Sequence, residues 1–270
     1  MTQKRPDLPA GSISRRKILA AVPALPVFWG TACAAAAKPY EARIFSAGFD
    51  GSVYLGGLHI VMNPGWKTYW RVPGAGGIPP SIEVQGGNIA AFAFSCPLPQ
   101  RIASEDGEAI GYKDEVIFPW TLTPADRAVR VQAAVSAFVG ICETVCIPVP
   151  VAQDLTLEPV GVATRETALL AGWQAKVPRQ GTIVSFVAAV EDDGVFIDVA
   201  LSRPAKDVFV EGSAMHFFLP PVWSDGQRRA RLKVNGAKSA GELRNKPLRM
   251  TFVTQGGEAA GGLEQTVTVS

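Results

Sequence analysis

Two cysteines four positions apart, Cys142 and Cys146, are the residues whose type and spacing best suit chemistry in this chain. In the chain-entropy model, a disulfide across so short a loop adds only about 2 kcal/mol to stability, against about 4 kcal/mol for a loop of about fifty residues. A short bridge stabilises weakly and re-forms easily, which favours an exchangeable disulfide. A purely structural bridge is the alternative.

Exchange needs one thiolate that attacks a disulfide and a second thiol that resolves the mixed disulfide, and Cys142 and Cys146 supply both. No basic residue lies between them or directly beside them in the sequence, and the charge of Glu143 disfavours a neighbouring thiolate. We expect Cys146 to face the partner. Pro148 lacks an N–H and fixes φ, so we predict that it ends strand pairing just after the pair and keeps Cys146 in an accessible turn or edge.

Residues 1–37 have the three parts of an export signal: a basic segment with Arg15 and Arg16, an apolar run over residues 18–29 and an alanine-rich tract. The paired arginines favour the twin-arginine route. The apolar run is about a dozen residues and contains two prolines, so it is too short and too broken to span about 30 Å of hydrocarbon. We therefore predict cleavage.

The cleavage position has two interpretations. An Ala-x-Ala site near Ala36 favours removal of the whole segment, in which case Cys33 leaves with it. The alternative is a lipid anchor on Cys33, although Gly30 stands where a bulky aliphatic residue usually precedes such a cysteine. We expect the first and an exported protein without an anchor.

Cleavage would also change the charge of the chain. The first 37 residues contain five basic residues and one acidic residue, so the totals of 26 and 24 become 21 and 23. The net charge passes from +2 to −2. A chain without a basic excess is a poor partner for nucleic acid or an anionic membrane.

Short runs that alternate apolar and polar residues dominate the rest of the sequence, as in residues 195–199 and 231–235. This period of two is typical of half-buried β-strands, and many such runs between Gly, Pro and Asp clusters indicate sandwiches or barrels. One helix is predicted over residues 164–176, with Thr164 as its N-cap and Pro178 after its end. The further strand predictions cover residues 52–61, 116–122, 129–138, 184–190, 208–211, 248–253 and 265–269.

We therefore predict an all-β chain of two β-sandwich domains joined by a short helical connector. The expected boundaries are residues 38–160 for the first sandwich, 161–180 for the connector and 181–270 for the second sandwich. About 230 residues with near-half apolar content suffice for one large core or two small ones.

Four separated motifs resemble the N-terminal periplasmic domain of the thiol:disulfide interchange protein DsbD, and more closely its ScsB-like branch. They match in order and spacing over roughly residues 45–155. The resemblance implies immunoglobulin-like sandwiches. The four motifs are residues 63–71 (Asn-Pro-Gly-Trp-Lys-Thr-Tyr-Trp-Arg), Pro73-Gly74 with Pro79-Pro80, Gly111-Tyr112, and residues 142–148.

The resemblance also implies a function. Cys142 and Cys146 would be the redox pair of a thiol-disulfide oxidoreductase or relay module in the periplasm. They would take electrons from a membrane-embedded thiol reductase and pass them to periplasmic thioredoxin-like proteins. The membrane domain of the longer relatives is not within these 270 residues, so the reductase is expected to be a separate protein. The spacing of the two cysteines is shorter than in the best-known members but suits the ScsB-like branch.

A cap loop and aromatic side chains line the site in the resembled domain. The corresponding positions are Glu105, Asp106 and Tyr112 for the cap region, and Trp66 and Tyr69 for the aromatic lining. The alternative for both aromatic residues is an ordinary place in the core of the sandwich.

Cys96, which leaves an odd count of three cysteines after the signal, is expected to be a buried free thiol; a third redox thiol or a metal ligand is the alternative. His59 and His216 lie in apolar strand-like runs, where a structural histidine is expected. The sequence contains no zinc-type cysteine spacing, and no cofactor is expected. Two other functions remain open: Cu(I) binding or delivery by the same soft sulfur ligands, and a structural adapter.

Overall fold

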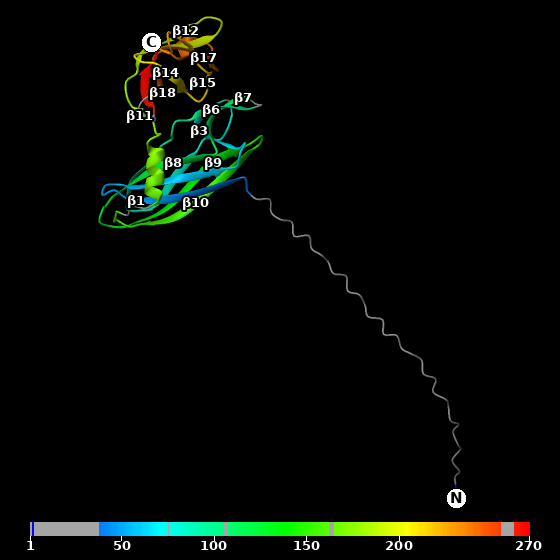
Figure 1. Ribbon diagram of the computed structural model, residues 1–270, viewed down its shortest axis with the longest axis vertical. Coiled ribbons are helices and arrows are strands. Elements are labelled where there is room, and N and C mark those ends of the chain that lie inside the picture. Colours follow the sequence, from blue (N-terminus) through cyan, green and yellow to red (C-terminus); the bar gives the residue numbers. More distant parts are fainter. Residues whose placement is uncertain (1, 3–37, 75, 105–106, 162–164, 255–261) are drawn as a thin grey trace. The chain divides into compact units, whose positions relative to one another are not determined.

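The computed structural model describes residue 2 and residues 38–270, with gaps at 75, 105–106, 162–164 and 255–261. The predicted signal with Cys33, the cap residues Glu105 and Asp106, and the predicted N-cap Thr164 therefore lie outside the described residues. The described part is all-β with one α-helix (Figure 1). None of its helices has the length and apolar character needed to cross a membrane.

Ten strands build the first sandwich. One sheet has the order β1-β2-β8-β5; the other has the order β10-β9-β3-β7-β6, and β4 also pairs with β9. All these pairings are antiparallel. The bounds are β1 Tyr40–Phe49, β2 Tyr54–Met62, β3 Lys67–Gly74, β4 Ser81–Gly87, β5 Ile89–Phe94, β6 Gln100–Ser104, β7 Gly107–Lys113, β8 Glu115–Pro124, β9 Val131–Cys142 and β10 Cys146–Leu157.

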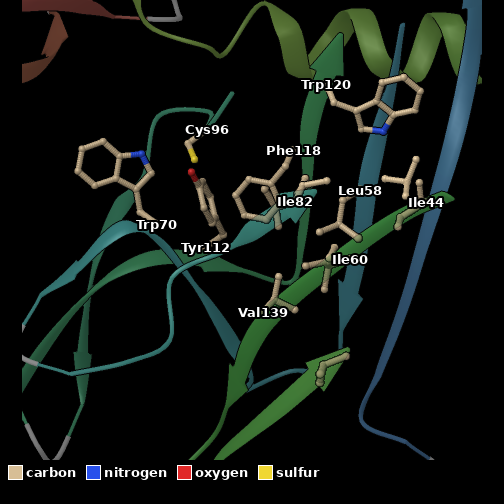
Figure 2. Close-up of a cluster of buried hydrophobic side chains, with 14 of the residues drawn as sticks. Ile44, Leu58, Ile60, Trp70, Ile82, Cys96, Tyr112, Phe118, Trp120 and Val139 are labelled. Atoms are coloured by element: carbon tan, nitrogen blue, oxygen red, sulfur yellow. The ribbon is translucent and has the colours of Figure 1, made fainter. Parts of the chain in front are cut away.

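Strand β9 shows how the sequence pattern becomes a core. Its residues alternate between buried and exposed from Val131 to Phe138, so one face of the strand packs between the two sheets. From Val139 to Cys142 every residue is buried, because this end of β9 is covered on both faces. The largest fully buried side chains of this core include Trp70, Trp120 and Phe118 (Figure 2). The buried end of β9 leads directly into the cysteine pair.

The one α-helix of the described residues, α1 (Arg165–Gln174), lies within the range 164–176 predicted from the sequence. Its side chain Leu170 is fully buried in a cluster with Phe45, Ala47 and Ile117 of the first sandwich. Figure 1 shows the helix beside β8. The helix thus packs on the first sandwich as well as leading to the strands that follow.

The remaining strands form two more sheets, in the orders β11-β19-β18-β14 and β12-β13-β17-β15, with β16 also pairing with β17. Their buried residues form a second core, separate from the first. The fold is immunoglobulin-like, as predicted. The bounds are β11 Arg179–Gln180, β12 Val184–Glu191, β13 Val195–Leu201, β14 Ala205–Glu211, β15 Phe217–Phe218, β16 Val222–Ser224, β17 Arg229–Asn235, the 3₁₀ turn Ala240–Glu242, β18 Pro247–Thr254 and β19 Leu263–Thr268.

Candidate redox site

The cysteine pair closes the end of the β9–β10 hairpin. Cys142 is the last residue of β9, Cys146 is the first residue of β10, and the two face each other across the antiparallel ladder. Facing residues of such a ladder bring their side chains to the same side of the sheet. A disulfide joins the two sulfurs.

The two sulfurs differ in exposure. Cys142 is only 1% exposed and packs in a small cluster with Tyr69, Ile102 and Ala109, whereas Cys146 is exposed. An incoming thiolate can therefore reach Cys146, with Cys142 as the sulfur that leaves. This asymmetry agrees with the expectation that Cys146 faces the partner.

Tyr69 of β3 is the aromatic residue that touches the pair. Its ring is buried, and its hydroxyl oxygen lies 3.3 Å from the Sγ of Cys146. The backbone of Gly77 lies directly on this ring: a Cβ added there would come within 2.3 Å of Tyr69 Cε1. Gly77 also has a φ of +131°, which disfavours a side chain. Glycine at position 77 thus lets the chain cover Tyr69.

Lys67 is a site residue that the sequence analysis missed. It faces Cys142 across the β3–β9 ladder, and its Nζ donates a hydrogen bond of 2.9 Å to the carbonyl oxygen of Glu143. The side chain is largely buried, so an ammonium group is fixed beside the turn between the cysteines. The cysteines have no basic neighbour in the sequence, but the fold places Lys67 beside them. A positive charge near a cysteine favours its thiolate form.

A cleft of about 470 Å³ opens beside the disulfide. Strands β6 and β7 provide one wall, and the glycine pair at 76–77 with Tyr69 and Lys67 provides another. Gly107 and Glu108, which follow the predicted cap residues 105–106 in the sequence, line this cleft. The wall contributed by β6 and β7 comprises Ile102, Ala103, Gly107, Glu108, Ala109 and Lys113.

The other two aromatic candidates pack in or against the first core. The hydroxyl of Tyr112 donates a 2.7 Å hydrogen bond to the carbonyl oxygen of Pro97, and its ring meets Phe118 edge to face. Trp66 is partly buried and packs against the first core. Of the predicted lining residues, the structure brings Tyr69 to the pair and places Trp66 and Tyr112 against the core.

Pro148 does not end strand pairing, contrary to our prediction. Strand β10 continues to Leu157, with Pro148 opposite Gly140. The N–H of Gly140 donates to Ile78 and its carbonyl accepts from Thr68, both away from β10. A residue opposite Gly140 therefore needs no N–H, and β10 is an edge strand, where proline is tolerated.

Cys96 is a buried free thiol, as predicted. Burial raises the pKa of this thiol to about 11, and Figure 2 shows it beside Tyr112. His59 contacts Glu115 at 2.7 Å, and His216 contacts the hydroxyl of Ser213 at 3.1 Å. Within the described residues, no cluster of three or more His, Cys, Asp or Glu side chains suits a metal ion.

Together, the fold and the site define an immunoglobulin-like domain with a cysteine pair suited to thiol–disulfide exchange. Residues 34–158 match the family described as thiol:disulfide interchange protein DsbD, N-terminal. The resemblance drawn from the motifs is thereby confirmed. None of the curated proteins compared with the chain matches it.

A solved structure extends the likeness over most of the chain. The N-terminal periplasmic domain of ScsB from Proteus mirabilis superposes with a TM-score of 0.67 and 19% sequence identity. The match covers 86% of this chain and 94% of the ScsB domain. The ScsB domain is thus similar in fold to a region well beyond residues 34–158.

Proposed function

We propose that the chain is a periplasmic relay in thiol–disulfide exchange. It would accept reducing equivalents from a separate membrane-embedded thiol reductase and pass them to thioredoxin-like proteins through Cys142 and Cys146. The observation that supports this most is the asymmetric pair, with Cys146 exposed at a cleft and Cys142 buried behind it. The family match over residues 34–158 supports thiol–disulfide interchange as the chemistry. Residues 1–37 would direct export.

Reduction of the cysteine pair takes two thiol–disulfide exchange steps. A thiolate of the reductase attacks the Sγ of Cys146, the bond between the two cysteines breaks, and the sulfur of Cys142 leaves as a thiolate that takes up a proton. The second thiolate of the reductase then attacks its own sulfur in the mixed disulfide and releases Cys146. Two electrons and two protons have passed to the chain. The reverse sequence reduces a disulfide of the acceptor, with Cys146 attacking and Cys142 resolving.

The surroundings of the pair suit these steps. The hydroxyl of Tyr69 is close enough to donate to Cys146 when that sulfur carries negative charge. The ammonium of Lys67 holds the carbonyl of Glu143 and so fixes the turn from which both sulfurs project. The turn then keeps Cys142 close to Cys146 for resolution.

The experiment that tests the proposal is the reduction potential of the pair in purified protein. The protein is equilibrated with glutathione or dithiothreitol buffers, and alkylated thiols are counted by mass spectrometry. A potential between about −180 and −270 mV, the range of known exchange proteins, is expected. A potential below about −300 mV would mark a structural bridge and overturn the relay.

A further inference from the structure

Arg101 of β6 ties one wall of the redox cleft to the second sandwich. Its Nε and Nη2 donate to the two carboxylate oxygens of Asp207 on β14, at 2.8 and 3.1 Å. Nη2 also donates to the carbonyl oxygen of Val208 at 2.9 Å, and Nη1 donates to Glu108 of β7 at 2.6 Å. One side chain therefore joins both strands of the β6–β7 wall to β14.

The ion pair between Arg101 and Asp207 has the forked, two-bond geometry of a strong interaction. Two parallel bonds between a guanidinium and a carboxylate fix orientation as well as distance. The Asp207 carboxylate is itself held by the N–H of Val208 at 2.8 Å, and the guanidinium lies over the ring of Phe209 at 4.9 Å. The side chains of Arg101 and Asp207 are only 16% and 23% exposed, so solvent screens them weakly.

The strands held by Arg101 are those that bury Cys142. Ile102 follows Arg101 directly, Ala109 follows Glu108, and both pack in the cluster with Tyr69 and Cys142. A shift of the β6–β7 wall would therefore open the contact that keeps Cys142 from solvent. The burial of Cys142 underlies the asymmetry of the pair.

We propose that Asp207 of the second sandwich is a positioning residue for the redox pair. It holds Arg101, and Arg101 holds the β6–β7 wall against Cys142. This assigns the second sandwich a role in the site without any direct contact with sulfur. The inference rests on the proposed function only in taking Cys142 as the resolving thiol, and its test involves neither a partner nor a potential.

The test measures how fast Cys142 reacts in the reduced, full-length protein. Iodoacetamide labels the thiols, and tandem mass spectrometry follows Cys142, Cys146 and Cys96 separately. Asp207→Ala removes the carboxylate fork, which should raise the rate at Cys142 about tenfold, because local opening becomes more populated. The rate at Cys146, which is already exposed, should stay within about twofold. Hydrogen exchange should accelerate in β6 and β7.

A matched control exists in the second sandwich. Arg231 donates to Asp198 through Nε and Nη2 at 2.7 and 2.8 Å, the same forked geometry, but on strands that do not line the cleft. Asp198→Ala should leave the rate at Cys142 unchanged. Asp207→Asn, which keeps the shape of the side chain, should give a smaller increase in the labelling rate at Cys142. This variant replaces Asp207→Ala in the test if Asp207→Ala does not fold.

Three outcomes would overturn the proposal. The first is an unchanged rate at Cys142 in both Asp207 variants. The second is an equal increase in Asp198→Ala. The third is a parallel increase at the buried Cys96, which would show general loosening of the protein rather than movement of the wall. A structural-range potential with a selective increase at Cys142 would refute the relay but support the role of Asp207.

Discussion

The hydroxyl of Tyr69 lies 3.3 Å from the sulfur of Cys146, although 77 positions separate the two residues in the sequence. Strand β3 brings them together, because it pairs with the end of β9 that enters the cysteine hairpin. In the oxidised pair this contact is weak, since a disulfide sulfur is a poor acceptor. In the reduced pair a thiolate would accept a charge-assisted hydrogen bond.

Tyr69→Phe should therefore lower the reduction potential of the pair. The hydroxyl stabilises the reduced form more than the oxidised form, and its loss should make the protein more reducing by about 10–30 mV, equivalent to a net hydrogen bond of about 0.5–1.5 kcal/mol. Equilibration with glutathione buffers measures this shift. Tyr112→Phe also removes a buried hydroxyl, but one bonded to Pro97, and should leave the potential unchanged. Equal shifts in both variants would contradict a specific role for Tyr69.

Cys142→Ala should trap partners far better than Cys146→Ala. Removal of Cys142 leaves the exposed sulfur without its resolving thiol, so mixed disulfides through Cys146 persist. Removal of Cys146 leaves a sulfur that is only 1% exposed and that partners cannot reach. Non-reducing gels of both variants, followed by mass spectrometry of the trapped species, provide the comparison. Equal trapping, or more with Cys146→Ala, would reverse the assignment of the attacking thiol.

Gly77→Ala and Gly76→Ala should differ although the residues are neighbours. A Cβ at Gly77 would collide with the Tyr69 ring, and the backbone there has a positive φ, so we expect a loss of about 1–3 kcal/mol. At Gly76 nothing lies within 4 Å of an added Cβ, and the change should stay within about 0.5 kcal/mol. Urea unfolding of both variants measures the difference. Equal stabilities would show that position 77 does not cover Tyr69 closely in solution.

Stability should fall above pH 9 in part because of Cys96. Burial raises the pKa of this thiol from 9.0 to about 11, so the unfolded chain releases its proton first. The contribution of the neutral Cys96 thiol to the free energy of unfolding is fully present below pH 9. It falls by about 2–3 kcal/mol as the pH rises to about 11. Cys142 and Cys146 do not contribute while they form a disulfide. Urea unfolding between pH 8 and 11 measures the slope.

The Cys96→Ala variant separates this effect from that of Tyr112, whose pKa burial also raises. Loss of the thiol should flatten the part of the slope that begins near pH 9 and leave the part due to Tyr112, whose ordinary pKa is 10.0. An identical pH dependence in the parent protein and the variant would mean that Cys96 is not buried as a neutral thiol.

Local pattern predicted much of the fold. The alternating run at residues 195–199 is the buried and half-buried alternation of β13, and the helix at residues 164–176 contains α1. These features depend on side chains a few positions apart, so they can be read from the sequence. The cysteine pair could be identified from the sequence for the same reason, because the short spacing of the two cysteines alone limits their chemistry.

The rest of the site depends on strand register over long separations. Lys67 faces Cys142 only because β3 pairs with the last residues of β9, and no spacing along the chain signals this. Whether Pro148 interrupts the pairing of β10 with β9 likewise depends on the direction in which the N–H and carbonyl of Gly140 point. The motif at residues 63–71 contains both Lys67 and Tyr69, and its resemblance to the DsbD N-terminal domain was the signal available without a structure.

The prolines of β10 restrict how another protein can approach the pair. Pro148 and Pro150 lie on the edge strand that begins at Cys146, and both fall in the register positions whose N–H would point away from β9. The outer edge thus lacks two successive donors beside the exposed sulfur, so an extended segment cannot extend the sheet there. A partner must dock by its side-chain surface. The two prolines also hinder edge-to-edge pairing between copies of the chain.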